Sequence, residues 1–143
     1  VYLLEPEAKR LGIVINMQSA EPVWVLADSV ALDQIVHNLL MNAFQALEQS
    51  STELKRLQIS TSQHDSFGEL RVTDNGAGIP EDVLPRLFEP FFSTREGGLG
   101  LGLSLCETLA QGMGGEISAS NQAQGGAVFK LSLPLSKLET PAT

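Results

Sequence analysis

The chain has 143 residues, 43% of them hydrophobic and 18% charged, which suits one compact domain. No apolar run approaches the ~20 residues of a membrane-spanning helix, and the first residues lack the basic start of a signal peptide, so we expect a soluble chain. The formal charge of −8 argues against a nucleic-acid-binding surface, which would need clustered Lys and Arg. The single cysteine, Cys106, excludes a disulfide within the chain.

Apolar periodicity and turn signals predict an alternating α and β chain. In the first half we expect a helix over 2–11, strands over 13–17 and 23–27 paired as a hairpin, and a long helix over 30–48 capped by Asp28 and Ser29. In the second half we expect a hairpin of strands over 57–61 and 69–73, a short helix over 81–87, a loop over 88–98, a helix from 98 to 113, and strands over 116–120 and 127–133.

The long helix carries a polar stripe beside its apolar face. Gln34, Asn38 and Asn42 follow each other at intervals of four residues and therefore share one side of the helix. Asparagine is a poor helix former, so two of them in a helix interior need a reason. The stripe is either a solvated face or a pair of amide oxygens directed at a metal ion and its phosphates.

Asp74 ends a predicted strand, and the chain then turns through Gly76 and Gly78. A fixed carboxylate at a strand end can accept a hydrogen bond from the exocyclic amine of adenine. Glycines let the backbone turn tightly, so that a flat base can lie against it. Asp-Asn-Gly is also an ordinary hairpin turn signal, so this stretch alone leaves both interpretations open.

Gly98, Gly100 and Gly102 alternate with leucines at the start of a helix. Such a segment directs backbone N–H groups and the positive end of the helix dipole at one point, which suits phosphate oxygens. No Gly-Lys-Ser or Gly-Lys-Thr follows, so it is not a Walker A loop, and its spacing differs from that of dinucleotide folds. The preceding loop, rich in phenylalanine, either packs on the core or forms a mobile lid.

Together these motifs resemble the catalytic and ATP-binding domain of bacterial sensor histidine kinases, in the GHKL group that also includes gyrase, Hsp90 and MutL. Residues 38–43 resemble the N box, 74–78 the G1 box, 88–92 the F box, 98–103 the G2 box, and 125–129 the final glycine motif. The resemblance implies the Bergerat fold, an α/β (α+β) two-layer sandwich. Its mixed, mainly antiparallel sheet is covered on one face by three helices, with an ATP lid between the F and G2 boxes. Residues 1–134 would form this domain, and 135–143 a flexible C-terminal tail.

The resemblance also implies the site. The residues expected to bind the nucleotide are Asn38, Asn42, Asp74, Gly76, Gly78, Ile79, Phe92, Thr94, Arg95, Gly98, Leu99, Gly100, Leu101, Gly102 and Leu103. Asp74 would contact the adenine amine, and Asn42 would coordinate Mg²⁺ with Asn38 beside it on the phosphate side. Arg95 would reach the γ-phosphate, so that Asn38, Asn42 and Arg95 form the catalytic set.

Two positions depart from the family pattern. Gln45 stands where many relatives have a basic residue, and Ala127 stands where a Thr or Ser is common. Each change removes one potential contact to the nucleotide, and a lost hydrogen bond is worth roughly 0.5–1.5 kcal/mol. We therefore expect weaker binding rather than none.

Neither histidine suits a phosphoacceptor. His37 lies inside the N-box helix, and His64 lies in a hairpin turn. The resemblance therefore implies that this chain binds ATP, ADP and Mg²⁺ and acts on a histidine in a separate dimerisation and phosphotransfer domain of the same kinase. A response-regulator receiver domain would be the next partner, with no nucleic acid and no direct membrane contact.

By the same resemblance we expect a cytoplasmic location and a monomeric chain. The lid and the Asn-Ala-Phe-Gln-Ala segment resemble kinases for nitrogen, oxygen and dicarboxylate sensing. Two alternatives stay open: an ATPase of the gyrase and Hsp90 type, and a non-catalytic nucleotide-sensing module. Those ATPases activate water with an N-box glutamate, whereas Asn38, in the equivalent place, cannot act as a base.

Overall fold

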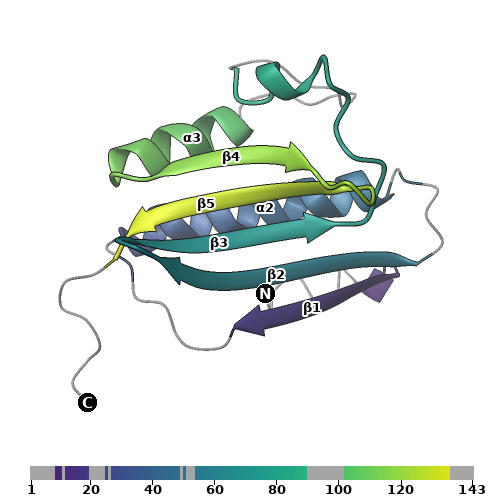
Figure 1. The fold of residues 1–143 in the computed structure, drawn as a ribbon, viewed down its shortest axis with the longest axis horizontal. Coiled ribbons are helices and arrows are strands. Elements are labelled where there is room, and N and C mark those ends of the chain that lie inside the picture. Colours follow the sequence, from purple (N-terminus) through teal and green to yellow (C-terminus); the bar gives the residue numbers. More distant parts are fainter. Residues whose placement is uncertain are drawn as a thin grey trace.

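The computed structural model describes residues 9–10, 12–19, 25, 27–48, 50, 54–89 and 102–135. In these residues a five-stranded sheet has the strand order β1-β2-β3-β5-β4 (Figure 1). The elements are β1 (Ile13–Ser19), α2 (Ser29–Glu48), β2 (Lys55–His64), β3 (Phe67–Asp74), the 3₁₀ turn η2 (Leu84–Arg86), α3 (Gly102–Gly112), β4 (Glu116–Asn121) and β5 (Ala127–Pro134). No helix in this part of the chain is long and apolar enough to cross a bilayer.

The sheet is mixed but mainly antiparallel, as predicted. Only β1 and β2 run parallel, whereas β2–β3, β3–β5 and β4–β5 are antiparallel pairs. Tight turns explain the two hairpins: Asp65 takes a φ of 52° between β2 and β3, and Gly125 and Gly126 take positive φ between β4 and β5. This order places the end of β3 beside the start of β5, far apart in sequence.

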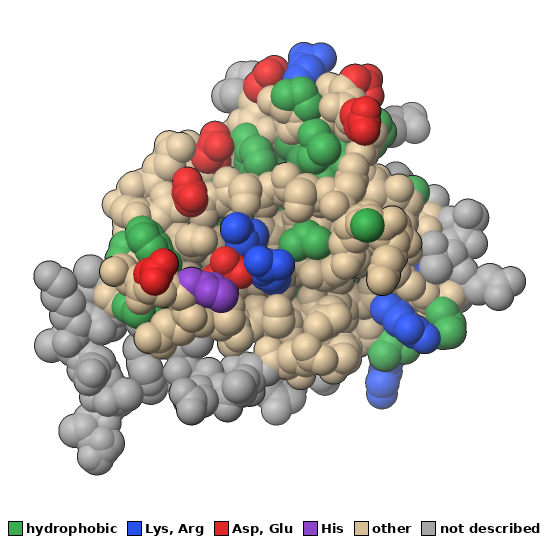
Figure 2. All heavy atoms as spheres, in the orientation of Figure 1, with side chains coloured by type: hydrophobic (Ala, Val, Ile, Leu, Met, Phe, Trp, Pro, Cys, Tyr) green, Lys and Arg blue, Asp and Glu red, His purple; other side chains and the backbone are tan. Residues whose placement is uncertain are grey.

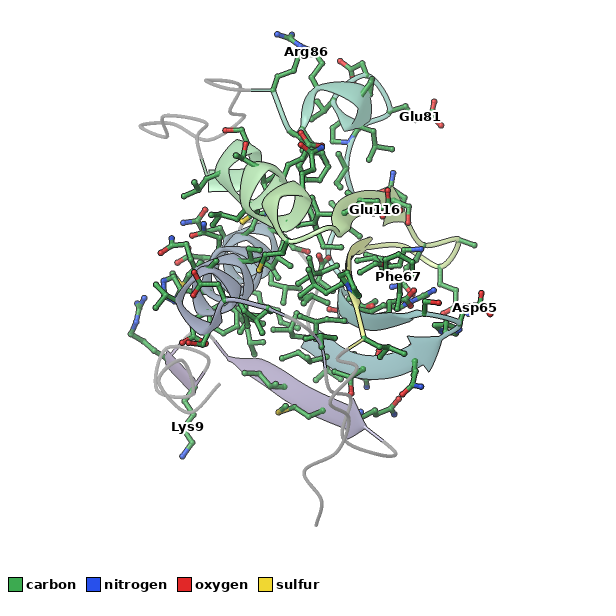
Figure 3. The ribbon with its side chains drawn as sticks, turned by 90° about the vertical axis from the view of Figure 1, so that its left-hand side faces the viewer. Lys9, Asp65, Phe67, Glu81, Arg86 and Glu116 are labelled. Atoms are coloured by element: carbon green, nitrogen blue, oxygen red, sulfur yellow. The ribbon has the colours of Figure 1, made fainter. Side chains whose placement is uncertain are left out.

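Both helices pack on the same face of the sheet, which makes a two-layer sandwich (Figure 3). The apolar face of α2, including Ile35, Leu39 and Phe44, is almost completely buried against inward-facing strand residues such as Leu57 and Val72. Burying one such side chain contributes about 1.5–3 kcal/mol. The predicted N-cap of α2 at Asp28 is confirmed, since the Val30 backbone N–H donates to Asp28 Oδ1 at 3.0 Å.

The opposite face of the sheet is polar and carries a charge cluster (Figure 2). At its centre is Glu69, whose side chain is only 10% exposed, with the Arg71 Nε 2.6 Å from Oε1 and the Lys130 Nζ 3.8 Å from Oε2. Burial alone would raise the pKa of Glu69. The hydrogen bond from Arg71 and the charges of Arg71 and Lys130 reverse this and lower the pKa of Glu69 below its usual range.

One predicted strand pairing differs from the structure, and one predicted helical piece is shorter than expected. In the described residues the expected hairpin of the first two strands is not seen: β1 pairs in parallel with β2, and Val25, the described residue of the second strand with a pairing, bridges Leu135. Parallel neighbours need a long crossover, and α2 supplies it between β1 and β2. The expected helix over 81–87 is a turn followed by the single 3₁₀ turn η2, since Pro85 lacks the N–H that would donate to the carbonyl of Glu81.

The described residues include only part of the other predicted elements, which are the third helix, the 88–98 loop and the C-terminal tail. The resemblance implied three helices on one face, and the described residues contain two that pack there, α2 and α3. The predicted helix over 2–11, apart from residues 9–10, lies outside the described residues. So do most of the 88–98 loop and the predicted tail over 135–143, apart from residue 135.

Candidate functional site

A hollow of about 350 Å³ opens between α2 and the segment that follows β3. We call it the larger hollow. Asn42, Gln45 and Ala46 of α2 line one side, the segment 77–80 lines another, and Asp74 and Phe129 come from the sheet. Its walls are mostly apolar with a few polar groups, which is the usual character of a small-molecule site.

Asp74 is the buried carboxylate of this hollow and is only 3% exposed. Its Oδ1 accepts hydrogen bonds from the backbone N–H of Gly76 at 2.9 Å and of Ala127 at 3.3 Å. Oδ2 accepts no hydrogen bond from the described residues. The carboxylate is therefore fixed in orientation through one oxygen, and the other oxygen keeps its full capacity to accept from a ligand.

Burial raises the pKa of Asp74 above its ordinary value, and the hydrogen bonds from Gly76 and Ala127 oppose that rise. In the free protein the ionised carboxylate therefore lacks part of the solvation that water would give it. A ligand that donates a hydrogen bond to Oδ2 restores some of that solvation. An exocyclic amine is a suitable donor.

The turn after Asp74 depends on glycine, as the sequence suggested, but for a further reason. Gly78 has a φ of +86°, and a Cβ placed there would lie 3.0 Å from Asn121 Oδ1. The missing side chain thus makes room for an asparagine from β4 as well as for a ligand. Asn121 Oδ1 accepts from the Ile79 N–H, and Asn121 Nδ2 donates to the Ile79 carbonyl, both at 2.7 Å.

A second asparagine, Asn75, ties the end of β3 to the start of β2. Asn75 Oδ1 accepts from the backbone N–H of Arg56 at 2.8 Å, and its Nδ2 donates to the carbonyl of Leu54 at 2.7 Å. Gln122 adds support, since its Nε2 donates to the carbonyl of Asp74 at 3.3 Å. Sequence reasoning missed Asn121 and Gln122, because an asparagine before a turn gives no local sign of a partner 42 residues away.

A smaller hollow of about 200 Å³ adjoins the first. It is lined by Asn38, Met41, Asn42, Gln45, Gly102 and Leu103. Asn42 and Gln45 line both hollows and therefore mark their junction. The structure thus brings the two N-box asparagines to the N-terminus of α3, where the positive end of the helix dipole favours anions.

The side chain of Asn38 is hydrogen-bonded to the buried thiol of Cys106. Asn38 Nδ2 donates to Cys106 Sγ at 3.5 Å, and Cys106 Sγ lies 4.0 Å from the carbonyl of Ile35. The amide oxygen of Asn38 accepts no hydrogen bond from the described residues, so it can accept one from a ligand in the smaller hollow. Burial raises the pKa of Cys106, while the hydrogen bond from Asn38 opposes it, so the thiol is protonated.

The residues at the junction fit a magnesium ion carried by phosphates. Within the described ranges, no group of three or more His, Cys, Asp or Glu side chains could hold a metal by itself. Magnesium commonly takes only one or two protein oxygens and completes its shell with phosphates and water. The amide oxygen of Asn42 is of the right kind. Gln45 Oε1 is buried there with no hydrogen-bond partner, which suits an additional donor such as a water on the ion.

Several predicted site residues cannot be placed. Phe92, Thr94, Arg95, Gly98, Leu99, Gly100 and Leu101 lie outside the described residues. Those that can be placed fall into two groups: Asp74, Gly78 and Ile79 at the larger hollow, and Asn38, Gly102 and Leu103 at the smaller one. Asn42 belongs to both groups, and Gly76 supports Asp74 through its backbone N–H.

Comparisons with known proteins relate the chain to one family. Residues 27–137 match the family model described as histidine kinase-, DNA gyrase B-, and HSP90-like ATPase. The sensor histidine kinase TmoS of Ectopseudomonas mendocina is 36% identical over 137 residues, which cover 94% of this chain but 14% of that protein. The chain thus corresponds to a small part of such a kinase.

Solved structures give the same result. The catalytic domain of histidine kinase ThkA superposes with a TM-score of 0.83 at 29% identity, covering 94% of this chain and 86% of that one. The structure of ThkA in complex with the response regulator TrrA matches with a TM-score of 0.78 at 26% identity, covering 97% of this chain and 39% of that one. The predicted two-layer fold and the resemblance to sensor histidine kinases are therefore confirmed.

Proposed function

The chain belongs to the histidine kinase-, DNA gyrase B-, and HSP90-like ATPase family, and we propose that it is the part of a sensor kinase that binds Mg·ATP. It then presents the γ-phosphate to a histidine on a separate dimerisation and phosphoacceptor domain. Residues 1–134 form this unit in the proposal. From that histidine the phosphoryl group passes to an aspartate on a response-regulator receiver domain, and the reaction takes place in the cytoplasm.

The observation that carries the proposal is the state of Asp74. Its carboxylate is nearly fully buried, fixed through Oδ1 by two backbone N–H groups, and open to a donor at Oδ2. Adenine offers an amine at its edge and a flat apolar ring. The larger hollow offers Oδ2 for the amine and the apolar surfaces of Ile79, Phe129 and Ala46 for the ring.

The smaller hollow supplies the phosphate side of the proposal. A nucleotide whose base lies against Asp74 would cross the junction at Asn42 and reach the N-terminus of α3. There the Gly102 end of the helix favours phosphate oxygens. When bound, Mg²⁺ neutralises the charge of the phosphates, and in this chain Asn42, with Asn38 beside it, would hold it.

Phosphoryl transfer depends mainly on positioning and on charge stabilisation, so this part of a kinase needs no nucleophile of its own. Asn38 favours the kinase over an ATPase, because an amide cannot take a proton from an attacking water. Its nitrogen is also committed to Cys106. Steady phosphate release by the chain alone should therefore be slow.

Calorimetry with a non-hydrolysable ATP analogue, with and without Mg²⁺, tests the proposal. We expect the wild type to bind and Mg²⁺ to tighten binding, and we expect Asn42→Ala to lose the effect of Mg²⁺ while it still binds the base. Gln34→Ala is the matched control, since Gln34 lies on the same stripe of α2 but lines neither hollow. A folded wild type that binds no adenine nucleotide would refute the proposal.

Phosphotransfer needs a second measurement. An isolated dimerisation and phosphoacceptor domain of a sensor histidine kinase is supplied together with labelled ATP. We expect an acid-labile phosphohistidine on that domain. Rapid phosphate release that does not depend on the added domain would favour the ATPase. Nucleotide binding with neither outcome would favour a nucleotide-sensing module.

A further inference from the structure

We propose that Asn121 is a positioning residue for the nucleotide base, acting through the backbone of Ile79. The inference rests on the proposed function and extends it to a residue on β4 that does not line the larger hollow. Asn121 reaches the ligand site through the two hydrogen bonds to Ile79 and through its position beside Gly78. Its role is to fix the wall that faces the base.

We call the two hydrogen bonds between the Asn121 side chain and the Ile79 backbone the clamp. One carboxamide satisfies both backbone groups of Ile79, with its oxygen accepting from the N–H and its nitrogen donating to the carbonyl, at 2.7 Å each. Both distances are short for N–H···O hydrogen bonds. The arrangement resembles a pair of strand residues exchanging both of their backbone hydrogen bonds. It fixes both the position and the orientation of the Ile79 peptide groups.

What the clamp holds is a wall of the hollow. Residues 77–80 line it on the side of the turn, and no regular element runs through them. Among the described residues, Asn121 supplies the hydrogen bonds that the backbone N–H and carbonyl of Ile79 make. Gly78 leaves the space that Asn121 occupies, since a Cβ at Gly78 would lie 3.0 Å from Asn121 Oδ1.

The same β4–β5 hairpin also holds the other side of the base contact. The Ala127 N–H donates to Asp74 Oδ1, and Gln122 Nε2 donates to the Asp74 carbonyl, each at 3.3 Å. One turn of the chain therefore fixes both the acceptor for the amine and the wall that faces the ring. Asn121 sets the spacing between them, and that spacing determines which base fits.

Asn75, which lies before the 77–80 wall and does not line the larger hollow, provides a matched comparison. It makes the same kind of two-sided contact, at 2.8 and 2.7 Å, but it holds Arg56 and Leu54, which do not line the larger hollow. A role confined to stabilising the fold predicts similar behaviour for the two asparagines. A positioning role predicts that only Asn121 affects the base.

The test measures ADP and IDP affinity by calorimetry for the wild type, Asn121→Ala and Asn75→Ala, together with each unfolding temperature. Asn121→Ala removes two hydrogen bonds of typical strength, so we expect its ADP affinity to be about tenfold lower than that of the wild type. Its preference for ADP over IDP should also be smaller than that of the wild type. Asn75→Ala should stay within about twofold of the wild type on the same scale. With a phosphoacceptor domain supplied, Asn121→Ala should raise the KM for ATP and leave kcat unchanged.

Asn121→Asp is the second variant, in case the alanine variant does not fold. It keeps the volume and one acceptor, but it sets a carboxylate oxygen against the Ile79 carbonyl, so it should lose ADP affinity to a similar extent. Asn121 variants that fold and bind both nucleotides like the wild type would overturn the inference, as would equal losses in the Asn75 variant. A wild type that binds neither nucleotide overturns the proposed function itself.

Discussion

Asp74→Asn is the sharpest perturbation of the candidate site, because it changes the chemistry of one atom and leaves the scaffold in place. The amide oxygen can still accept from Gly76 and Ala127, as Oδ1 does now. The outward atom then becomes an N–H₂ group, which donates where Oδ2 accepted. An adenine amine would meet a donor, whereas the 6-oxo group of hypoxanthine would meet a suitable partner.

The size of the effect follows from the charge of the acceptor. A hydrogen bond to a charged group is worth about 1.5–3 kcal/mol, which corresponds to a loss of ADP affinity of about 10- to 150-fold. The ratio of IDP to ADP dissociation constants should fall by at least as much. Calorimetry with both nucleotides measures the two quantities directly.

Stability separates this effect from simple unfolding. The pKa of Asp74 is raised by burial, so the folded state binds its proton more tightly than the unfolded state does. The stabilisation from that proton is fully present below the ordinary Asp pKa and is lost as pH rises through the raised value. At neutral pH the ionised Asp74 therefore does not stabilise the free protein, and Asp74→Asn should unfold at the same temperature as the wild type or a higher one.

Asp65→Asn is the matched control, because the same substitution is made in an exposed turn that lines neither hollow. Asparagine tolerates the positive φ of that position. The control should bind ADP as the wild type does. A folded Asp74→Asn protein with wild-type ADP affinity would refute the assignment of Oδ2 to the adenine amine.

Three further predictions follow from the structure. Gly126→Ala should lower the unfolding temperature and abolish ADP binding, since a Cβ there would collide with the Asp74 carbonyl. Its control is Gly114→Ala, which has a similar positive φ but its nearest atom 3.4 Å away, and which should cost only the roughly 1–2 kcal/mol of backbone strain in urea unfolding. Glu69→Gln should make the free energy of unfolding fall less steeply at acid pH, as measured by unfolding at a series of pH values. The pKa of Glu69 is lower in the folded protein than in the unfolded chain, so the carboxylate stabilises the fold above the ordinary Glu pKa. That stabilisation is lost as pH falls through the pKa of the folded state. The fully buried thiol of Cys106 should react with an alkylating reagent at the rate of local opening, and addition of urea should increase that rate steeply; fast labelling of the native protein would contradict its burial.

The parts of the fold that local sequence patterns could predict are those with strong periodicity. The 3.6-residue spacing of Ile35, Leu39 and Phe44 predicted α2 to within one residue at each end. Alternation likewise located β5, where every second residue from Ala127 is buried. Pairing was harder: strand partners depend on α2 crossing the sheet, and nothing within 13–17 or 23–27 indicates that.

The residues of the candidate site likewise include some that the sequence could predict and some that it could not. Asp74, Asn42 and Gly78 stand in motifs with a recognisable order, so the sequence could identify them as a set. Asn121 and Gln122 act on backbone groups more than forty residues away, through contacts that exist only once β3 and β5 are adjacent. Such residues carry no mark in the sequence beyond being polar residues before a turn.

The adjacency of β3 and β5 has a consequence for the order in which the molecule matures. During translation Asp74 is added to the chain well before Ala127, whose backbone N–H is one of the two that orient the Asp74 carboxylate. During synthesis the carboxylate thus remains without its full set of partners until the last hairpin has emerged and joined the sheet. A nucleotide that requires the oriented carboxylate would bind only the completed domain, so its binding energy would oppose global unfolding rather than the fraying of single elements.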